Sequence, residues 1–151
     1  MRIISKQGPL TNYADRDHCI EYIVAWCLLN GNLDANSYTD EAASDSRIDS
    51  LREITSTSEN TEYTNRYYNL DERAIPNKVT VTLKNGDVME EEVIYPLGHR
   101  ERREESKPYL KKKFNNSLQN TGLDQTFLSD AYNTLDLDKV EIYDILKKIY
   151  K

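Results

Sequence analysis

The feature that most constrains this chain is an unbroken apolar stretch, residues 23–29. The pattern around it favours a helix from about Arg16 to Asn30, with Asp15 as the N-terminal cap and Gly31 at the C-terminal end. At about 3.6 residues per turn, a continuous apolar run of this length covers the whole circumference of a helix. The sequence therefore predicts a helix that is buried on all sides, and the run is far too short to span a bilayer.

The charge balance excludes one class of partner. The 151 residues include 20 Lys and Arg against 26 Asp and Glu, which gives a formal net charge of −6. A net-acidic chain without a basic block is a poor candidate for binding nucleic acid. The N-terminal residues have neither the apolar core of a signal peptide nor an Arg/Ser-rich leader. We therefore expect no nucleic-acid and no membrane partner, and no targeting segment within this sequence.

The two cysteines, Cys19 and Cys27, are eight residues apart on the predicted helix. A rise of about 1.5 Å per residue separates their Cα atoms by roughly 12 Å. A disulfide needs Cα atoms within about 7 Å, so we expect two free thiols that act as small apolar residues in a reducing compartment. With only two histidines and no zinc spacing, the sequence predicts neither a metal nor a cofactor.

Further along the chain, a second helix is expected near residues 46–54. The polar, Tyr-rich stretch 55–77 is interpreted as an ordered loop that contains at most a short strand. The clearest local signal is a β-hairpin, with alternating apolar residues in 79–83 and a return strand over 87–95. Between these strands stands Asn85-Gly86, which is typical of a type I′ turn with two positive φ angles.

Three C-terminal helices complete the predicted elements, over about 108–118, 124–135 and 138–150. Pro108 suits the first turn of its helix. The apolar face of the last helix is too broad for a free surface helix, so it needs a partner that this chain only partly supplies. The predicted fold class is α+β: a partial small α/β domain with an antiparallel hairpin and a buried helix, followed by C-terminal helices.

Several blocks between residues 2 and 118 form an ordered set, which is more specific than any single block. They are Lys6-Gln7-Gly8-Pro9-Leu10, residues 14–22, residues 28–31, residues 45–52, residues 67–77, Tyr95-Pro96-Leu97-Gly98-His99 with Arg102-Arg103, and Lys113-Phe114. In this order and spacing the chain resembles the C-terminal portion of the 2-methylcitrate dehydratases of the MmgE/PrpD family.

The resemblance implies a division of the chain. Residues 1–100 would be the rear part of the family's small α+β domain, and residues 101–151 a helical segment that returns to a large all-α domain. That larger domain would lie outside this sequence. Its absence would account for a short apolar segment near the N-terminus, Arg2-Ile3-Ile4, that lacks a partner strand, and for the broad apolar face of the last helix. Full-length members of the family pair as homodimers.

The implied activity is a hydro-lyase reaction that removes water from 2-methylcitrate, a tricarboxylate, to give 2-methyl-cis-aconitate in propionate breakdown. Such a dehydration needs a general base, a general acid and groups that hold the carboxylates, and this family uses no iron–sulfur cluster. Its main acid–base residues lie upstream, so we assign no general base here and expect the chain alone to be inactive. Eukaryotic members work in the mitochondrial matrix, which is the favoured location, and bacterial members in the cytosol.

Two alternatives remain open at this point. One is another activity of the same family, such as aconitate decarboxylation. The other is a non-catalytic fragment that only associates with intact copies.

The resemblance marks a first group of candidate site residues on the predicted helix. Tyr22 matches a family tyrosine that faces the substrate, where its hydroxyl would bond a carboxylate or hydroxyl; the alternative is a core tyrosine bonded to the backbone. Arg16, Asp17 and His18 form the polar first turn. Arg16 would clamp a substrate carboxylate and His18 would donate a hydrogen bond or a proton. The alternative is a capping network among these side chains.

A second group follows the hairpin, in a glycine loop with dense charge. His99 and Arg102 would contact the substrate, because a glycine loop brings the backbone close to a ligand and an arginine binds a carboxylate with two N–H groups. The alternative is solvated charge around a turn, which we favour for Arg100 and Arg103.

Overall fold

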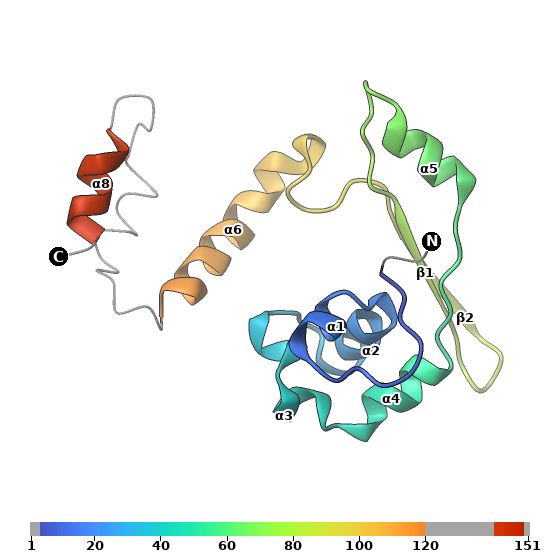
Figure 1. Cartoon of the computed structure of the whole chain (residues 1–151). Coiled ribbons are helices and arrows are strands. Elements are labelled where there is room, and N and C mark those ends of the chain that lie inside the picture. Colours follow the sequence, from blue (N-terminus) through green and yellow to red (C-terminus); the bar gives the residue numbers. More distant parts are fainter. Residues whose placement is uncertain (1–3, 120–140, 150–151) are drawn as a thin grey trace. The chain divides into compact units, whose positions relative to one another are not determined.

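The computed structural model describes residues 4–119 and 141–149. These residues form helices and one two-stranded antiparallel sheet, the α+β class that the sequence predicted (Figure 1). It falls into two compact units, Met1–Thr61 and Glu62–Lys151. The predicted boundary near residue 100 concerns the domains of the family and stays a prediction. None of the described helices combines the length and the apolar character that crossing a bilayer would demand.

The first unit is built from short helices around a small core. Its core residues are Cys19, Tyr22, Ala25 and Ile48, with Trp26 among the side chains packed against them. Helix α2 packs on helix α4, which brings Ile48 to the core. The elements are α1 (Tyr13–Asp17), α2 (Ile20–Asn30), η1 (Ala35–Tyr38), α3 (Asp40–Ala43) and α4 (Ser46–Glu53). The helix predicted near residues 46–54 is thus confirmed.

The long helix predicted from Arg16 to Asn30 is wrong in its first turns. Asn12, not Asp15, is the N-terminal cap of α1, and its side chain accepts a hydrogen bond from the Asp15 N–H at 2.9 Å. Helix α1 ends at Asp17 with His18 as its C-terminal cap, and Cys19 is extended with φ −125° before α2 begins. The N–H of Ile20 donates instead to the carbonyl of Ile4 at 2.7 Å, a non-local bond that local sequence signals do not reveal.

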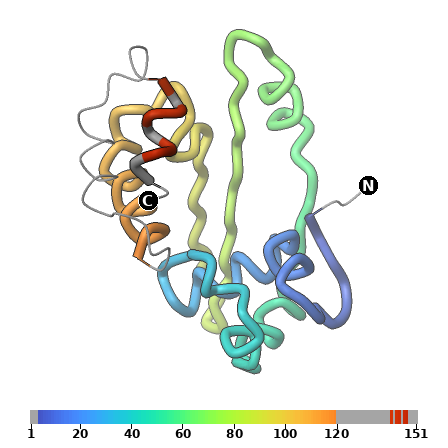
Figure 2. The backbone as a smooth tube through the Cα atoms, turned by 60° about the vertical axis from the view of Figure 1, so that its left-hand side comes forward, coloured from blue at the N-terminus to red at the C-terminus, as the bar shows by residue number. Residues whose placement is uncertain are grey.

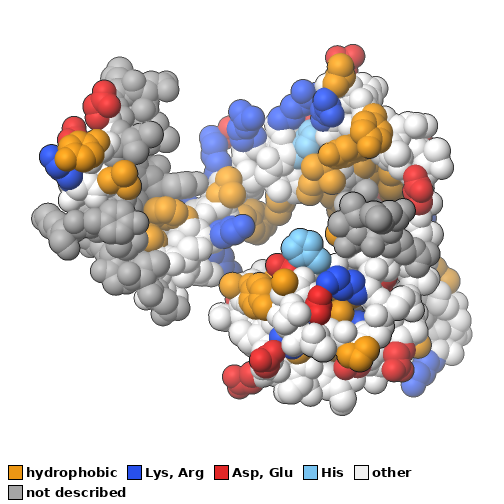
Figure 3. All heavy atoms as spheres, in the orientation of Figure 1, with side chains coloured by type: hydrophobic (Ala, Val, Ile, Leu, Met, Phe, Trp, Pro, Cys, Tyr) orange, Lys and Arg blue, Asp and Glu red, His pale blue; other side chains and the backbone are white. Residues whose placement is uncertain are grey.

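Helix α2 is buried on one face rather than on all sides. Tyr22 and Ala25 are buried, whereas Leu28 is 53% exposed. Apolar side chains reach the surface in several places (Figure 3). The predicted free thiols are confirmed: Cys19 is buried and Cys27 partly buried, and burial raises the pKa of the Cys27 thiol.

The second unit contains a hairpin and helices on either side of it in the sequence (Figure 2). The predicted loop 55–77 is wrong where helix α5 forms, because partners distant in the sequence fix a segment with weak local signals. Tyr63 of α5 bonds Glu92, and Arg66 bonds Glu72. The elements are α5 (Thr61–Tyr68), β1 (Asn77–Thr82), β2 (Val88–Val93), η2 (Arg100–Arg102), α6 (Arg103–Leu118) and α8 (Ile142–Ile149).

The hairpin strands are confirmed, but the predicted type I′ turn is wrong. Strands β1 and β2 are antiparallel, with Val79 opposite Glu91. The Gly86 N–H donates to the Leu83 carbonyl at 2.9 Å, and only Gly86, with φ 92°, has a positive φ in this turn. This is a type I turn closed by a glycine bulge. Asn85 keeps a negative φ, and its side chain accepts the Asp87 N–H at 3.0 Å.

Helix α6 begins at Arg103, earlier than the predicted start at Pro108, which lies inside the helix. Glu104 and Glu105 stand in its first turn, where a carboxylate interacts favourably with the helix dipole. The predicted helix 124–135 lies outside the described residues. Helix α8 covers part of the predicted helix 138–150.

The core of the first unit generates a stability prediction. We expect Ile48→Ala to lower the free energy of unfolding by about 2–5 kcal/mol, because Ile48 is 1% exposed and the substitution leaves a cavity. The same change at Ile54, which is 81% exposed, should cost less than about 0.5 kcal/mol. Chemical denaturation followed by the fluorescence of Trp26, the single tryptophan, measures both values. Equal losses in the two variants would contradict this core.

Candidate functional site

Arg16 is the most unusual of the predicted site residues, because its charged side chain is buried. Only 5% of the residue is exposed. Its Nη1 donates to the Tyr38 carbonyl at 2.8 Å, and its Nη2 pairs with Asp40 at 2.7 Å. The Nε atom is buried and has no hydrogen-bond partner among the described residues. Most of this guanidinium therefore holds the segment after α2 in place.

Tyr22 lies beside this segment. The residue is 2% exposed, and its hydroxyl donates to the Ser37 carbonyl at 2.7 Å. Burial raises the pKa of the Tyr22 hydroxyl, so it stays a hydrogen-bond donor at neutral pH. This contact is the one that a core tyrosine makes, and the predicted contact with a substrate stays a prediction.

Asp17 and His18 form an ion pair at the break between α1 and α2. The Nδ1 atom of His18 lies 2.5 Å from the carboxylate of Asp17, and the His18 side chain is 61% exposed. The hydrogen bond that His18 donates to Asp17, together with the charge of that carboxylate, raises the pKa of His18. A hydrogen bond to the Ala14 backbone also raises this pKa. An exposed imidazole that a carboxylate orients can donate or accept a proton.

The predicted residues of the second unit also bond the backbone. His99 donates from Nε2 to the Arg73 carbonyl at 2.9 Å, and its Nδ1 accepts the N–H of Glu101 at 3.2 Å. Its ring stacks on Tyr95 at 4.7 Å between centroids. Arg102 donates to the Tyr95 carbonyl at 3.0 Å. Both ring nitrogens of His99 are thus engaged by the chain itself, and its predicted contact with a substrate stays a prediction.

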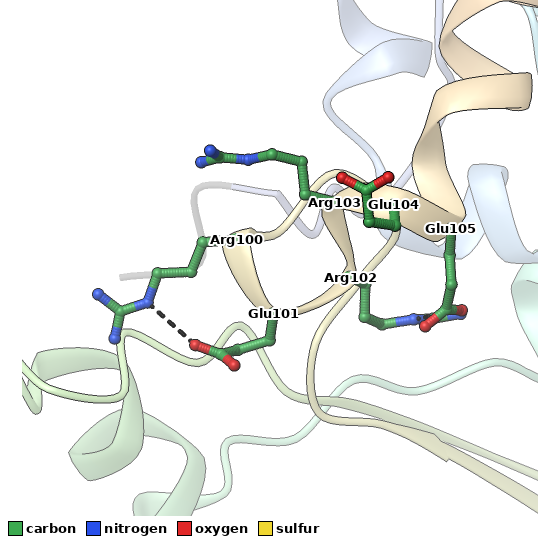
Figure 4. A pocket seen from close by; sticks show the side chains of 6 residues that line it. All are labelled: Arg100, Glu101, Arg102, Arg103, Glu104 and Glu105. Atoms are coloured by element: carbon green, nitrogen blue, oxygen red, sulfur yellow. Dashed lines mark hydrogen bonds and ion pairs between the residues drawn. The ribbon is translucent and has the colours of Figure 1, made fainter.

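A hollow of about 460 Å³ lies at the start of α6, lined by residues 100–105. Arg100 pairs with Glu101 at 3.3 Å, and Arg102 with Glu105 at 2.7 Å. The side chains leave the backbone in different directions and do not converge on a common point (Figure 4). These paired charges match the solvated turn that the sequence left open as an alternative.

A second cavity, of about 440 Å³, lies in the first unit, and the residues predicted for the site do not line it. Loop 6–9, Glu21 and part of α4 form its walls. Arg52 donates to the Gly8 carbonyl at 3.0 Å and pairs with Asp49 at 2.6 Å, but its buried Nε has no partner among the described residues. Neither Glu21 nor Arg52 was predicted from the sequence as a site residue.

Glu21 is a buried carboxylate, 5% exposed. It accepts hydrogen bonds from the hydroxyls of Ser5 at 2.5 Å and Thr57 at 2.8 Å. Burial alone raises the pKa of Glu21, but these bonds, its own N–H and the Cys19 thiol outweigh burial and leave the pKa below its usual value. The signal that could have revealed it is an acidic residue two positions before the predicted buried run of residues 23–29.

The first predicted group thus divides into two pairs of residues with different contacts. Arg16 and Tyr22 hold consecutive carbonyls, those of Tyr38 and Ser37, while Asp17 and His18 face outward as a pair. Among residues 4–119 and 141–149, no group of three or more His, Cys, Asp or Glu side chains is placed to hold a metal ion.

Comparison with known proteins gives consistent matches. Residues 1–129 match the MmgE/PrpD C-terminal domain. The chain is 56% identical over 115 residues to "2-methylcitrate dehydratase, mitochondrial" of Yarrowia lipolytica, covering 76% of this chain and 22% of that protein. It is 47% identical to "Probable 2-methylcitrate dehydratase" of Saccharomyces cerevisiae (78% and 23%), and 49% identical to "2-methylcitrate dehydratase" of Cupriavidus necator (78% and 25%).

The α+β fold and these matches define the chain as a C-terminal domain of the kind found in longer proteins. The chain belongs to the MmgE/PrpD family. It spans about a quarter of the length of the curated relatives that it matches.

The buried carboxylate generates a pH prediction. Because the pKa of Glu21 is lower in the folded chain than its usual value of 4.5, its contribution to stability is complete above that value and is lost as the pH falls through the folded-state pKa. We expect Glu21→Gln to lower the free energy of unfolding at pH 7 by about 1–3 kcal/mol, and the difference from wild type to shrink below pH 4.5.

Denaturation curves between pH 3 and about 7, followed by Trp26 fluorescence, measure this difference over a range that spans the carboxyl titration. Glu41→Gln, at an exposed position in α3, is the matched control and should change stability by less than about 0.5 kcal/mol. A Glu21→Gln deficit that stays constant over the whole range would contradict the assignment of an ionised, hydrogen-bonded carboxylate.

Proposed function

We propose that this chain is the C-terminal part of a 2-methylcitrate dehydratase, a hydro-lyase that converts 2-methylcitrate to 2-methyl-cis-aconitate. The observation that carries the proposal is the 47–56% identity to relatives of that name from both fungi and bacteria. On this proposal the chain forms one side of a carboxylate pocket. The part that precedes this domain in the relatives supplies the general base, and the chain alone is inactive.

Within the chain, the proposal assigns the acid to His18. Dehydration requires a proton for the departing hydroxyl, and a histidine with a raised pKa carries that proton at higher pH than an ordinary one. Asp17 holds Nδ1 of His18, whose side chain is 61% exposed. Arg16 and Tyr22 position the break between α1 and α2, because both bond the segment 37–40.

The full-length protein on this proposal is a homodimer that takes a tricarboxylate substrate. The Yarrowia relative is described as mitochondrial, and for a eukaryotic source we propose the mitochondrial matrix as the location.

The proposal is tested with a fusion in which this chain replaces the matching C-terminal segment of the Yarrowia enzyme. We expect the fusion to dehydrate 2-methylcitrate and the chain alone to do nothing. His18→Gln in the fusion should lower kcat by about 10²–10⁴-fold, the usual contribution of a general acid. Because the protonated imidazole is the active form, wild-type kcat should fall as the pH rises through the pKa of His18.

Asp17→Asn is the graded variant for this test. It removes the charge that raises the pKa of His18, so the decline of kcat should move to lower pH while the enzyme remains active. An unchanged pH profile would remove His18 from the acid role. A folded fusion that releases CO₂ from cis-aconitate but leaves 2-methylcitrate intact would favour a decarboxylase instead.

A further inference from the structure

The hairpin of the second unit has one apolar and one polar face. Residues paired across an antiparallel ladder point to the same side. Val81 opposite Met89 and Val79 opposite Glu91 therefore share one face, and Leu83 continues the alternation at its end. This set of residues, Val79, Val81, Leu83, Met89 and Glu91, is called the apolar hairpin face below.

The other face is polar and already satisfied by the chain. Within the strands it carries Lys78, Thr80, Thr82, Glu90 and Glu92, and Val88 is its one apolar residue. Glu90 accepts from Thr80 at 2.8 Å and pairs with Lys78 at 2.8 Å. Only one side of the hairpin thus has the composition of a surface that another layer covers.

The apolar hairpin face is open in the described structure. Val79 is 39% exposed, Leu83 41% and Met89 54%. A two-stranded sheet is marginally stable in water unless its apolar side packs against something. Scattered apolar residues need no explanation, but a contiguous set on one side of a regular hairpin indicates a docking surface.

Glu91 restricts what can cover this face. It stands among the apolar side chains and makes no ion pair with the described residues, whereas Glu90 on the opposite side has two partners. A carboxylate that becomes covered by an apolar layer requires a cation close by. The covering surface must therefore be apolar and must carry a lysine or arginine opposite Glu91.

A second copy of this chain does not meet that requirement with the same face. In a symmetric pair each apolar hairpin face would meet its own equivalent. The face contains a carboxylate and no cation, so two copies would bury two acids against apolar side chains without a counter-charge. The comparisons offer another source of chain, because the relatives are about four times as long as the part that this chain matches.

We propose that the apolar hairpin face binds the portion of an MmgE/PrpD protein that precedes this C-terminal domain, through an apolar surface with a basic side chain opposite Glu91. The inference rests on the proposed function in so far as the chain works together with that portion. It adds the surface that makes the contact and the charge that the partner supplies.

A pair of neighbouring substitutions tests the proposal. Val81→Lys places an ammonium group on the apolar hairpin face, and Thr82→Lys places the same group on the polar face of the same strand. The probe is the Yarrowia enzyme lacking the segment that matches this chain, titrated with the full 151-residue chain. We expect Val81→Lys to weaken binding at least tenfold and Thr82→Lys to leave it within about twofold of wild type, since a rim charge costs little. Equal affinity of the two variants would overturn the proposal.

A measurement on the wild-type chain guards against misfolding of the variants. Met89 is 54% exposed, so peroxide should oxidise it readily in the chain alone and at least tenfold more slowly in the complex, as followed by mass spectrometry of the peptide that contains it. Slow oxidation in the chain alone would overturn the proposal, because the chain or a second copy would then already cover the face. Oxidation at the free rate in a formed complex would do the same.

The failure of the proposed function is distinguishable from these outcomes. A complex that protects Met89 but does not dehydrate 2-methylcitrate would support the docking surface and contradict the proposed activity. A complex that dehydrates 2-methylcitrate while Met89 stays reactive would support the proposed activity and contradict the docking surface.

Discussion

In the first unit, two successive backbone carbonyls accept hydrogen bonds from side chains of α1 and α2, and the positions of the surrounding segments depend on these bonds. The Tyr22 hydroxyl bonds the carbonyl of Ser37, and the buried Arg16 guanidinium bonds that of Tyr38 and pairs with Asp40. Ser37 and Tyr38 stand at the C-terminal end of η1, where helix carbonyls lack partners within the helix, and these two side chains provide the donors. The bonds fix segment 37–40 against α1 and α2, and so fix the break that carries Asp17 and His18.

The second unit uses its predicted site residues in the same way. His99 bonds the carbonyl of Arg73, whose φ of 48° is strained for a residue with a side chain, and Arg102 bonds the carbonyl of Tyr95. Motif residues of a family are thus used here to hold irregular backbone in shape. The exception is the Asp17–His18 pair, in which the His18 side chain is 61% exposed.

Local patterns predicted some elements and missed those that distant contacts decide. The strands of the hairpin follow from an alternation contained within a few residues, and α4 follows from its cap at Asp45. The turn differs because the Asn85 side chain bonds Asp87, and the helix break differs because the N–H of Ile20 bonds Ile4.

The candidate site shows the same division. The sequence marked Asp17 and His18 as neighbours in a polar turn, and the structure pairs them. It did not mark Glu21, whose partners Ser5 and Thr57 lie far from it along the chain. A buried acid on an apolar helix becomes meaningful only when the hydroxyls that bond it are known, and no local pattern supplies them.

Covering the exposed Asp17–His18 pair would change its chemistry in a definite direction. Removal of water penalises the charged imidazolium and lowers its pKa, while the attraction of the Asp17 carboxylate grows as the dielectric constant falls and raises it. At 2.5 Å the carboxylate is close enough for the second effect to offset the first. A histidine without such a partner would lose its proton on burial and could no longer act as an acid at neutral pH. The acid role that we propose for His18 therefore depends on its pairing with Asp17, which keeps the imidazole protonated when water is removed.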